Sequence, residues 1–222
     1  MRKTDDLNHR SPDLIDMMPL DAKRVIDVGC GEGKIAQEYH IRAKPEYYMG
    51  IEILPEDVAI AKQFCDECLL GNIEEFSDLE WRALSNFDLW VFGDVLEHLY
   101  DPWKILCKVH SVIPAGGQLM CCIPNAQHWS IQARLSIGEW RYENKGLLDK
   151  THIRFFTKKT IIELLESSGF EVLEITPRYV YHPTTEKFLD IIGNLATACG
   201  GNPEEAKEDA SVFQYIFKAR KN

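Results

Sequence analysis

Residues 25–34, with the sequence VIDVGCGEGK, join an apolar run to a glycine-rich turn. Gly29, Gly31 and Gly33 lie two residues apart. Such glycines let the backbone approach a ligand closely, and the N-terminus of the helix that follows offers polar groups. A dinucleotide-binding fingerprint needs a further glycine for helix–strand packing, and Lys34 stands in that place. The turn therefore indicates a nucleotide-like ligand that has no pyrophosphate.

Two acidic residues accompany this turn. Glu52 ends a second apolar run, about 20 residues further on, where an acid accepts hydrogen bonds from a ribose diol. Asp27 lies within the first run and adds a carboxylate that faces the same crevice. This carboxylate would repel a pyrophosphate but attract a ligand with an ammonium group and a sulfonium. The two acids favour a cationic adenosine compound, the alternative being solvated acids at strand ends.

Several segments resemble the motifs of class I S-adenosylmethionine-dependent methyltransferases. VIDVGCGEG looks like motif I of that family, and GIE looks like the acidic element that follows it. FDLWVFGDVLEHLYDP resembles the motif after the fourth strand, and PAGGQLMCCIPN resembles the entry and exit of the fifth. The resemblance covers roughly residues 22–176. It implies S-adenosylmethionine as the co-substrate and S-adenosylhomocysteine as its product.

The resemblance also implies roles for matching positions. Gly29 and Gly31 would line the methionine part of the donor, with Asp27 near its ammonium group, and Glu52 would hold the ribose hydroxyls. The other implied cofactor-binding residues are Ile53 beside the adenine, Asn72 and Ile73 at its edge, and Asp94 and Val95 beneath the methionine part. Asn72 departs from the aspartate of many relatives, although its side-chain oxygen can accept the same hydrogen bond.

Residues 125–157 form a long insertion rich in aromatic and charged residues, which makes it the candidate site for the methyl acceptor. Its segment LLDKTHIRFFT resembles a signature of a methyltransferase branch associated with cell-surface sugars and natural products. His152 and Arg154 alternate along a strand-like segment, so both can face one side. Histidine suits a general base, and arginine suits an anchor for a carboxylate, a phosphate or a polyhydroxyl group. The candidate substrate-binding residues are His98, His128, Trp129, Tyr142 and Tyr181.

Structural interpretations of the same residues stay open at this point. Residues 151–157 can simply lead into the next helix, with Arg154 paired to Asp149 and Thr157 as the helix N-cap. His98 can be a wall of the active site or a helix-packing residue. The polar and aromatic side chains of the insertion form either a lid or a small core of their own: His128, Trp129, Arg134, Trp140 and Tyr142.

Apolar strand-like runs alternate with helix-like stretches along the chain. The predicted strands are 24–29, 47–53, 68–73, 87–95, 116–124, 170–176 and 211–221. The predicted helices are 33–41, 55–65, 101–113, 157–169 and 186–201, the last of them followed by an acidic turn. Several of the strand-like runs are apolar on both faces, which is typical of a mostly parallel sheet covered by helices.

This alternation predicts an α/β fold that is Rossmann-like and doubly wound. We expect a mostly parallel seven-stranded sheet with helices on both faces and an insertion after strand five. Residues 1–222 would form one domain, with a core of about 22–176 plus 210–220. Substrate or lid insertions would occupy about 125–157 and 178–210.

Composition and charge limit the kinds of binding partner that we expect. The formal net charge of −10 is a poor match for the field of a nucleic-acid backbone. The first residues, MRKTDDLNHRSPDL, have no apolar signal-peptide core, and no segment reaches the length of a membrane span. The seven cysteines lack a regular spacing, and Cys65 and Cys68 have no second pair to complete a zinc set. We expect reduced thiols, a cytoplasmic monomer or homodimer, and a small-molecule substrate.

The predicted activity is O-methylation of a small polar metabolite, such as a sugar, a carboxylate or a phosphonate-like acid. No D-x-x-D or D-N pair ends the strand-like run 87–95, so we expect the transfer to need no metal. The alternatives are an N- or C-methyltransferase, and a non-catalytic module that binds S-adenosylmethionine. A nicotinamide oxidoreductase is opposed by Lys34 and Asp27.

Overall fold

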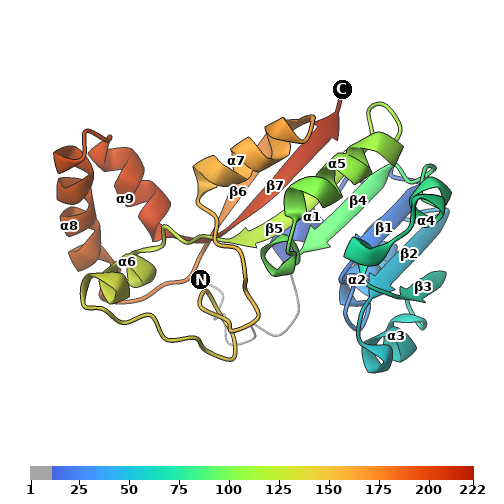
Figure 1. Ribbon diagram of the computed structural model, residues 1–222, viewed down its shortest axis with the longest axis horizontal. Helices are drawn as coiled ribbons and strands as arrows, with labels where there is room; N and C mark the ends of the chain where they lie inside the picture. Colours follow the sequence, from blue (N-terminus) through green and yellow to red (C-terminus); the bar gives the residue numbers. More distant parts are fainter. Residues whose placement is uncertain (1–11) are drawn as a thin grey trace.

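A computed structural model describes residues 12–222, which form an open seven-stranded sheet flanked by helices (Figure 1). The strands are β1 Arg24–Val28, β2 Tyr47–Glu52, β3 Glu67–Leu70, β4 Leu89–Gly93, β5 Gln118–Pro124, β6 Phe170–Tyr179 and β7 Val212–Lys221. Their order across the sheet is β3-β2-β1-β4-β5-β7-β6. Strands β1 to β5 pair in parallel, whereas β7 runs antiparallel to both β5 and β6. The predicted mostly parallel Rossmann-like sheet is confirmed.

The helices follow the strands as expected for crossover connections. They are α1 Pro12–Met17, α2 Lys34–Arg42, α3 Pro55–Ala61, α4 Asp78–Ala83, α5 Pro102–Val112, α6 Trp129–Ser136, α7 Lys158–Ser167, α8 Thr185–Ala198 and α9 Pro203–Ser211. Two 3-10 helices are η1 Ile73–Glu75 and η2 Leu96–His98. The expected acidic turn after α8 is instead helix α9, because Asn202 caps its first turn and Pro203 fits the first helical position.

The sheet is covered on both faces, because neighbouring residues of a strand point to opposite sides. In β4, Trp90 and Phe92 face one apolar cluster, to which α4, α5 and α7 contribute. Leu89 and Val91 of the same strand face the other cluster, to which α1, α2 and α3 contribute. Trp81 of α4 stacks on Trp90 with ring centroids 6.0 Å apart. This double packing holds the carboxyl ends of the central strands in fixed positions.

The helices of the two insertions lie together at one end of the molecule. Helices α6, α8 and α9 gather beyond the carboxyl end of β5 (Figure 1), and they share a small core of Trp129, Ile192 and Ala210. The preceding sequence interpretation of residues 151–155 as strand-like is wrong. These residues form no strand, and an isolated bridge joins the next residue, Phe156, to Asn125.

The seven cysteines are free thiols. Three of them converge on Gly50, where an added Cβ would lie 2.6 Å from the Cys30 sulfur, 3.1 Å from Cys68 and 3.3 Å from Cys65. Burial raises the pKa of Cys68 to about 12, so its reactive thiolate form is rare near neutral pH. This thiol cluster is a packing feature behind the glycine turn.

Residues 12–222 contain no helix with both the length and the apolar sequence that crossing a bilayer requires. Residues 1–11, in which we expected no signal peptide, lie outside the described part of the chain.

Candidate active site

The glycine turn lies at the carboxyl end of β1. Gly29, Gly31 and Gly33 all have positive φ, at 65°, 52° and 79°, a conformation that side chains other than glycine rarely adopt. An added Cβ on Gly29 would lie 2.6 Å from Val95 Cγ2, whereas one on Gly31 would meet nothing within 4 Å. Gly29 therefore allows close packing between the turn and the segment after β4, and Gly31 faces open space that a ligand can fill.

Glu52 ties the end of β2 to this turn. Its Oε2 accepts a hydrogen bond from the Gly31 amide at 2.9 Å. Its Oε1 accepts from the amides of Ile53 at 2.7 Å and Leu54 at 3.0 Å. The side chain is 7% exposed, so the carboxylate is held in one orientation. Because a carboxylate oxygen has two lone pairs, Oε2 keeps one with which to accept a hydrogen bond from a hydroxyl group.

Asp27 is a buried carboxyl group with an unsatisfied oxygen. Its Oδ2 accepts a hydrogen bond from the Tyr48 hydroxyl at 3.1 Å, and its Oδ1 has no hydrogen-bond partner. Burial raises the pKa of Asp27 to about 7; the Tyr48 hydrogen bond opposes this rise and the charge of Glu52 adds to it. A cationic ligand next to this group would stabilise its ionised form. This orphaned oxygen and the open space at Gly31 fit the charged donor that the sequence predicts.

The predicted adenine-side residues take different positions. Ile53 is 63% exposed, so its apolar side chain is free to contact a planar ring. Ile73 is 4% exposed and belongs to the core. Asn72 caps η1, because its Oδ1 accepts from the Glu74 amide at 3.0 Å. The second lone pair of that oxygen remains for an adenine amino group.

The contrast between two glycines gives a direct test of the turn. We expect Gly29→Ala to lower the free energy of unfolding by about 2–5 kcal/mol, because it combines positive-φ strain with a collision against Val95. Gly31→Ala carries only the strain of about 1–2 kcal/mol, yet its methyl group enters the space assigned to the donor. Chemical denaturation and calorimetry with S-adenosylhomocysteine separate the two effects. Equal stability losses, with unchanged binding in Gly31→Ala, would contradict this assignment.

Asp94 follows β4 and is the one described non-glycine residue with a positive φ, at 59°. Its Oδ1 accepts from Gln214 Nε2 at 2.6 Å, and Gln214 Oε1 accepts from Arg178 Nη1 at 2.7 Å. Arg178 also binds Asp13 of α1 through Nε at 3.1 Å. Burial raises the pKa of Asp94, against the opposing charge of Arg178. This chain of contacts is not apparent from the sequence, because its members come from four distant segments.

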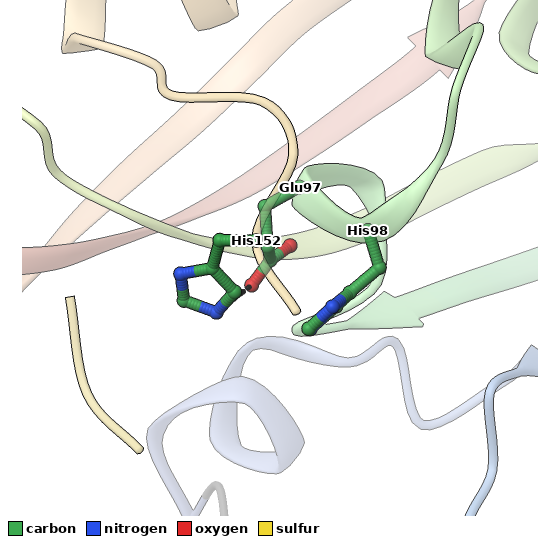
Figure 2. Close-up of side chains that lie close together, drawn as sticks. All are labelled: Glu97, His98 and His152. Atoms are coloured by element: carbon green, nitrogen blue, oxygen red, sulfur yellow. Dashed lines mark ion pairs between the residues drawn. The ribbon is translucent and has the colours of Figure 1, made fainter. Parts of the chain in front are cut away.

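Three side chains converge just beyond Asp94. Glu97 and His98 belong to the short helix η2, and His152 comes from the insertion (Figure 2). His152 Nε2 lies 3.9 Å from Glu97 Oε1, and the rings of His98 and His152 meet edge to face with centroids 4.8 Å apart. We call these three residues the Glu97 cluster. Val95, which packs close to Gly29, precedes Glu97 by two residues in the chain.

Burial controls the charges in the Glu97 cluster. Glu97 is 1% exposed, and neither carboxylate oxygen has a hydrogen-bond partner. Burial, with a further contribution from the charge of Asp94, raises the pKa of Glu97 well above its usual range. Burial, followed by the charge of His98, lowers the pKa of His152. Both shifts favour the neutral forms, so His152 has a lone pair available near neutral pH.

Glu97 is not among the site residues predicted from the sequence. Its signal was present in the sequence DVLEHL, where an acid stands inside an otherwise apolar run beside His98. Its backbone carbonyl accepts from the amides of Ile153 and Arg154, each at 3.0 Å, which fixes the insertion onto η2. The pattern thus places His152 beside Glu97 through main-chain contacts that side-chain spacing does not reveal.

Arg154 is not brought to the Glu97 cluster. Its Nε donates to the Tyr100 carbonyl at 3.1 Å, and its guanidinium lies 5.8 Å from the centre of the Trp103 ring. The suggested pair with Asp149 is also absent, since Asp149 Oδ1 instead accepts from the Thr151 amide at 2.8 Å. The alternative role of Thr157 is confirmed, because it caps α7 in a capping box. In this structure Arg154 fastens the insertion to the start of α5.

Of the remaining residues predicted to contact the acceptor, two are buried and two lie on the surface. His128 caps α6 by accepting from the Ser130 amide, and burial lowers its pKa to about 4. Trp129 stacks on Phe188 of α8 with centroids 5.0 Å apart. Trp129 belongs to the small core of the insertions, which was the structural alternative, and His128 is buried beside it. Tyr142 and Tyr181 are 57% and 86% exposed.

Two small cavities are lined by residues outside the candidate site. One of about 250 Å³ lies between α4 and α5 and is lined by Trp81, Lys108 and Val112 among others. The other, of about 160 Å³, lies beside α9 and is lined by Lys158, Asp209 and Tyr215 among others. Neither contains the glycine turn or the Glu97 cluster, so neither is the candidate active site.

Curated proteins with similar sequences include ubiquinone biosynthesis O-methyltransferases. The chain is 24% identical over 173 residues to the protein from Cereibacter sphaeroides, covering 73% of this chain and 66% of that protein. It is also 24% identical over 173 residues to the protein from Coxiella burnetii, covering 76% of this chain and 72% of that one. The chain thus spans about two thirds of the length of these relatives.

A solved structure with the same fold is an S-adenosylmethionine-dependent methyltransferase from Mesorhizobium loti. The TM-score is 0.64 at 18% sequence identity, and the match covers 95% of this chain and 96% of that one. Residues 5–175 match a protein family described as a methyltransferase domain. With its strand order, glycine turn and paired acids, the chain belongs to this methyltransferase domain family and is a class I S-adenosylmethionine-dependent methyltransferase.

Proposed function

We propose that this enzyme transfers the methyl group of S-adenosylmethionine to an oxygen atom of a small polar metabolite, such as a sugar, a carboxylate or a phosphonate-like acid. The observation that supports this most is the Glu97 cluster, because it offers proton-accepting atoms two residues beyond the contact between Val95 and Gly29. The names of the O-methyltransferase relatives support the same acceptor atom.

On this proposal, the chain's own residues orient the donor. Asp27 binds its ammonium group and Glu52 binds a ribose hydroxyl. Gly31 has no side chain, so it leaves room for the donor beside the backbone of the turn. Ile53 packs beside the adenine, and Asn72 accepts a hydrogen bond from the adenine amino group. Asp94 and Val95 form the floor beneath the methionine part. When bound, S-adenosylmethionine supplies a methyl group that the positive sulfur already activates.

The acceptor hydroxyl lies between this methyl group and the Glu97 cluster. Its oxygen attacks the methyl carbon, and the carbon–sulfur bond breaks with its electron pair remaining on sulfur. The hydroxyl proton passes to the Nε2 lone pair of His152, while the Leu147 carbonyl orients the ring through Nδ1. Alignment of the two reactants supplies most of the rate enhancement, and removal of the proton supplies a further part.

A phenolic acceptor is the second candidate. Trp140 and Phe155 lie in the insertion with ring centroids 5.4 Å apart and exposed fractions of 36% and 37%. Exposed aromatic side chains in the same insertion as His152 favour an acceptor that carries a planar ring. The names of the relatives in ubiquinone biosynthesis agree with such an acceptor.

Incubation of the full chain with methyl-labelled S-adenosylmethionine tests both candidates. The acceptor panel contains sugar phosphates, hydroxy acids, phosphonates and catechols, each paired with an amine analogue of the same shape. We expect label in an ether or ester of at least one oxygen acceptor. Label confined to nitrogen or carbon would refute O-methylation, and tight S-adenosylhomocysteine binding without any product would indicate a binding module.

A further inference from the structure

The Glu97 cluster presents three electron-pair donors to one point. The donor atoms of Glu97, His98 and His152 all lie within 4.8 Å of one another. Figure 2 shows the Glu97 carboxylate directed toward the His152 ring, with His98 on its other side. Glu97 is 1% exposed and His152 is 8% exposed, so bulk water screens the cluster poorly. Both carboxylate oxygens of Glu97 lack a hydrogen-bond partner.

Both imidazole rings are oriented by main-chain carbonyls. His98 Nδ1 lies 3.0 Å from the Thr151 carbonyl oxygen, and His152 Nδ1 lies 3.3 Å from the Leu147 carbonyl oxygen. A carbonyl accepts a hydrogen bond, so in the neutral rings the proton is on Nδ1. The lone pair is then on Nε2 in each ring. Histidines that bind metals are held by this kind of outer hydrogen bond, which fixes the tautomer and the ring orientation.

One cation can bridge these three electron-pair donors and stabilise the ionised form of the buried Glu97 carboxyl group. A buried carboxylate without a hydrogen-bond partner is costly, and two neighbouring lone pairs add to that cost. We propose that Glu97, His98 and His152 bind one divalent transition-metal ion. Two imidazole nitrogens and one carboxylate oxygen match Mn²⁺, Fe²⁺ or Zn²⁺, whereas Mg²⁺ and Ca²⁺ prefer oxygen ligands throughout.

This inference adds to the proposed function and rests on it only for the role of the ion. Three protein ligands leave coordination positions open, and an ion with open positions makes a nearby hydroxyl more acidic. A bound ion would coordinate the Nε2 lone pair of His152, so His152 would not accept the proton. The proton of the acceptor hydroxyl group would then go to solvent water. The expectation of metal-independent transfer came from the absence of a D-x-x-D or D-N pair after β4. That criterion does not detect ligands from η2 and the distant insertion.

Manganese titration of the full chain tests the proposal without an activity assay. The chain is first treated with a chelator and desalted, and free Mn²⁺ is then followed by electron paramagnetic resonance. Mn²⁺ is the probe because the exposed thiols of Cys107 and Cys199 would compete for Zn²⁺. We expect one Mn²⁺ bound per chain. Glu97→Gln and His98→Gln should each weaken this binding by about 100-fold or more, since loss of an outer-shell partner alone costs about 10–100-fold.

His40→Gln is the matched control, because His40 is a partly buried histidine of α2 outside the cluster. It should bind Mn²⁺ as the wild type does. Circular dichroism and S-adenosylhomocysteine binding establish that each variant is folded, and the half-buried His98 provides a second variant if Glu97→Gln does not fold. A wild-type chain without stoichiometric Mn²⁺, or a folded Glu97→Gln or His98→Gln variant with wild-type affinity, would overturn the proposal.

The labelled-methyl assay distinguishes this failure from failure of the proposed function. If the chain binds no Mn²⁺ but still transfers the methyl group to oxygen, the proposed function is supported and the metal site is refuted. In the converse case, the wild type binds one Mn²⁺ per chain, the cluster variants lose it, and label appears only on nitrogen. That result would support the metal site and refute O-methylation.

Discussion

His152→Gln is expected to lower kcat by about 10²–10⁴-fold, the usual contribution of a group that assists proton removal. His152 Nε2 faces the carboxylate of Glu97 at 3.9 Å, beyond the point where Val95 contacts the glycine turn. Glutamine keeps similar bulk and one hydrogen-bonding end, but it has no basic nitrogen lone pair. The loss follows whether His152 takes the proton or binds a metal ion. Single-turnover kinetics with the best oxygen acceptor measures the change.

The donor site provides the control for this variant. S-adenosylhomocysteine affinity should stay within about threefold of the wild-type value, because loss of a group that acts in the transition state leaves ground-state binding unchanged. Glu97→Gln should also lower kcat, since the Glu97 carboxyl group faces His152 Nε2 within the cluster. A His152→Gln enzyme with wild-type kcat would show that the acceptor proton leaves by another route.

Asp27→Asn is expected to weaken S-adenosylmethionine binding by about 10–100-fold at pH 8, the loss typical of a hydrogen bond to a charged group. The pKa of Asp27 is raised to about 7, so part of the wild-type population is protonated at neutral pH. A cationic ligand favours the ionised form, and binding below pH 7 must release a proton. Wild-type affinity should therefore fall by up to about tenfold per pH unit below 7. Asp27→Asn should show a flat profile over the same range.

Asp27 affects the stability of the ligand-free chain with the opposite pH dependence: ligand affinity falls at low pH, whereas stability falls at high pH. Asp27 binds its proton more tightly when folded, with a pKa of about 7, than when unfolded, near 3.8. Its stabilising contribution is therefore complete below pH 3.8 and is lost as the pH rises to about 7, by about 4 kcal/mol in total. Asp27→Asn should have a Tm about 10 °C above wild type at pH 8, with the difference vanishing near pH 4. Equal melting temperatures at pH 8 would contradict this pKa.

Local chemistry made the sheet and its turn predictable. The apolar runs before Gly29 and Glu52 are buried on both faces, and burial of that kind leaves a clear mark in the sequence. Thr157 was recognisable as a helix cap because its role depends only on neighbours within one helical turn. These features depend on contacts close in sequence or on a strict periodicity, so one sequence was sufficient to find them.

The acceptor side depends on contacts that sequence spacing does not encode. Residues 151–155 have the composition of a strand, but no neighbouring strand is available, and η2 binds their backbone instead. Trp129 and His128 were placed in the pocket because they are aromatic and polar, yet α8 and α9 bury Trp129 in a small core. Glu97 was overlooked because a buried acid in an apolar run is uncommon without a partner distant in sequence.

The most direct test is a crystal structure of the chain with S-adenosylhomocysteine and an oxygen acceptor. We expect the ribose to contact Glu52, the ammonium group to lie near Asp27, and the sulfur to face the Glu97 cluster with the acceptor oxygen between them. A donor bound away from the glycine turn, or a sulfur directed away from His152, would contradict this expectation.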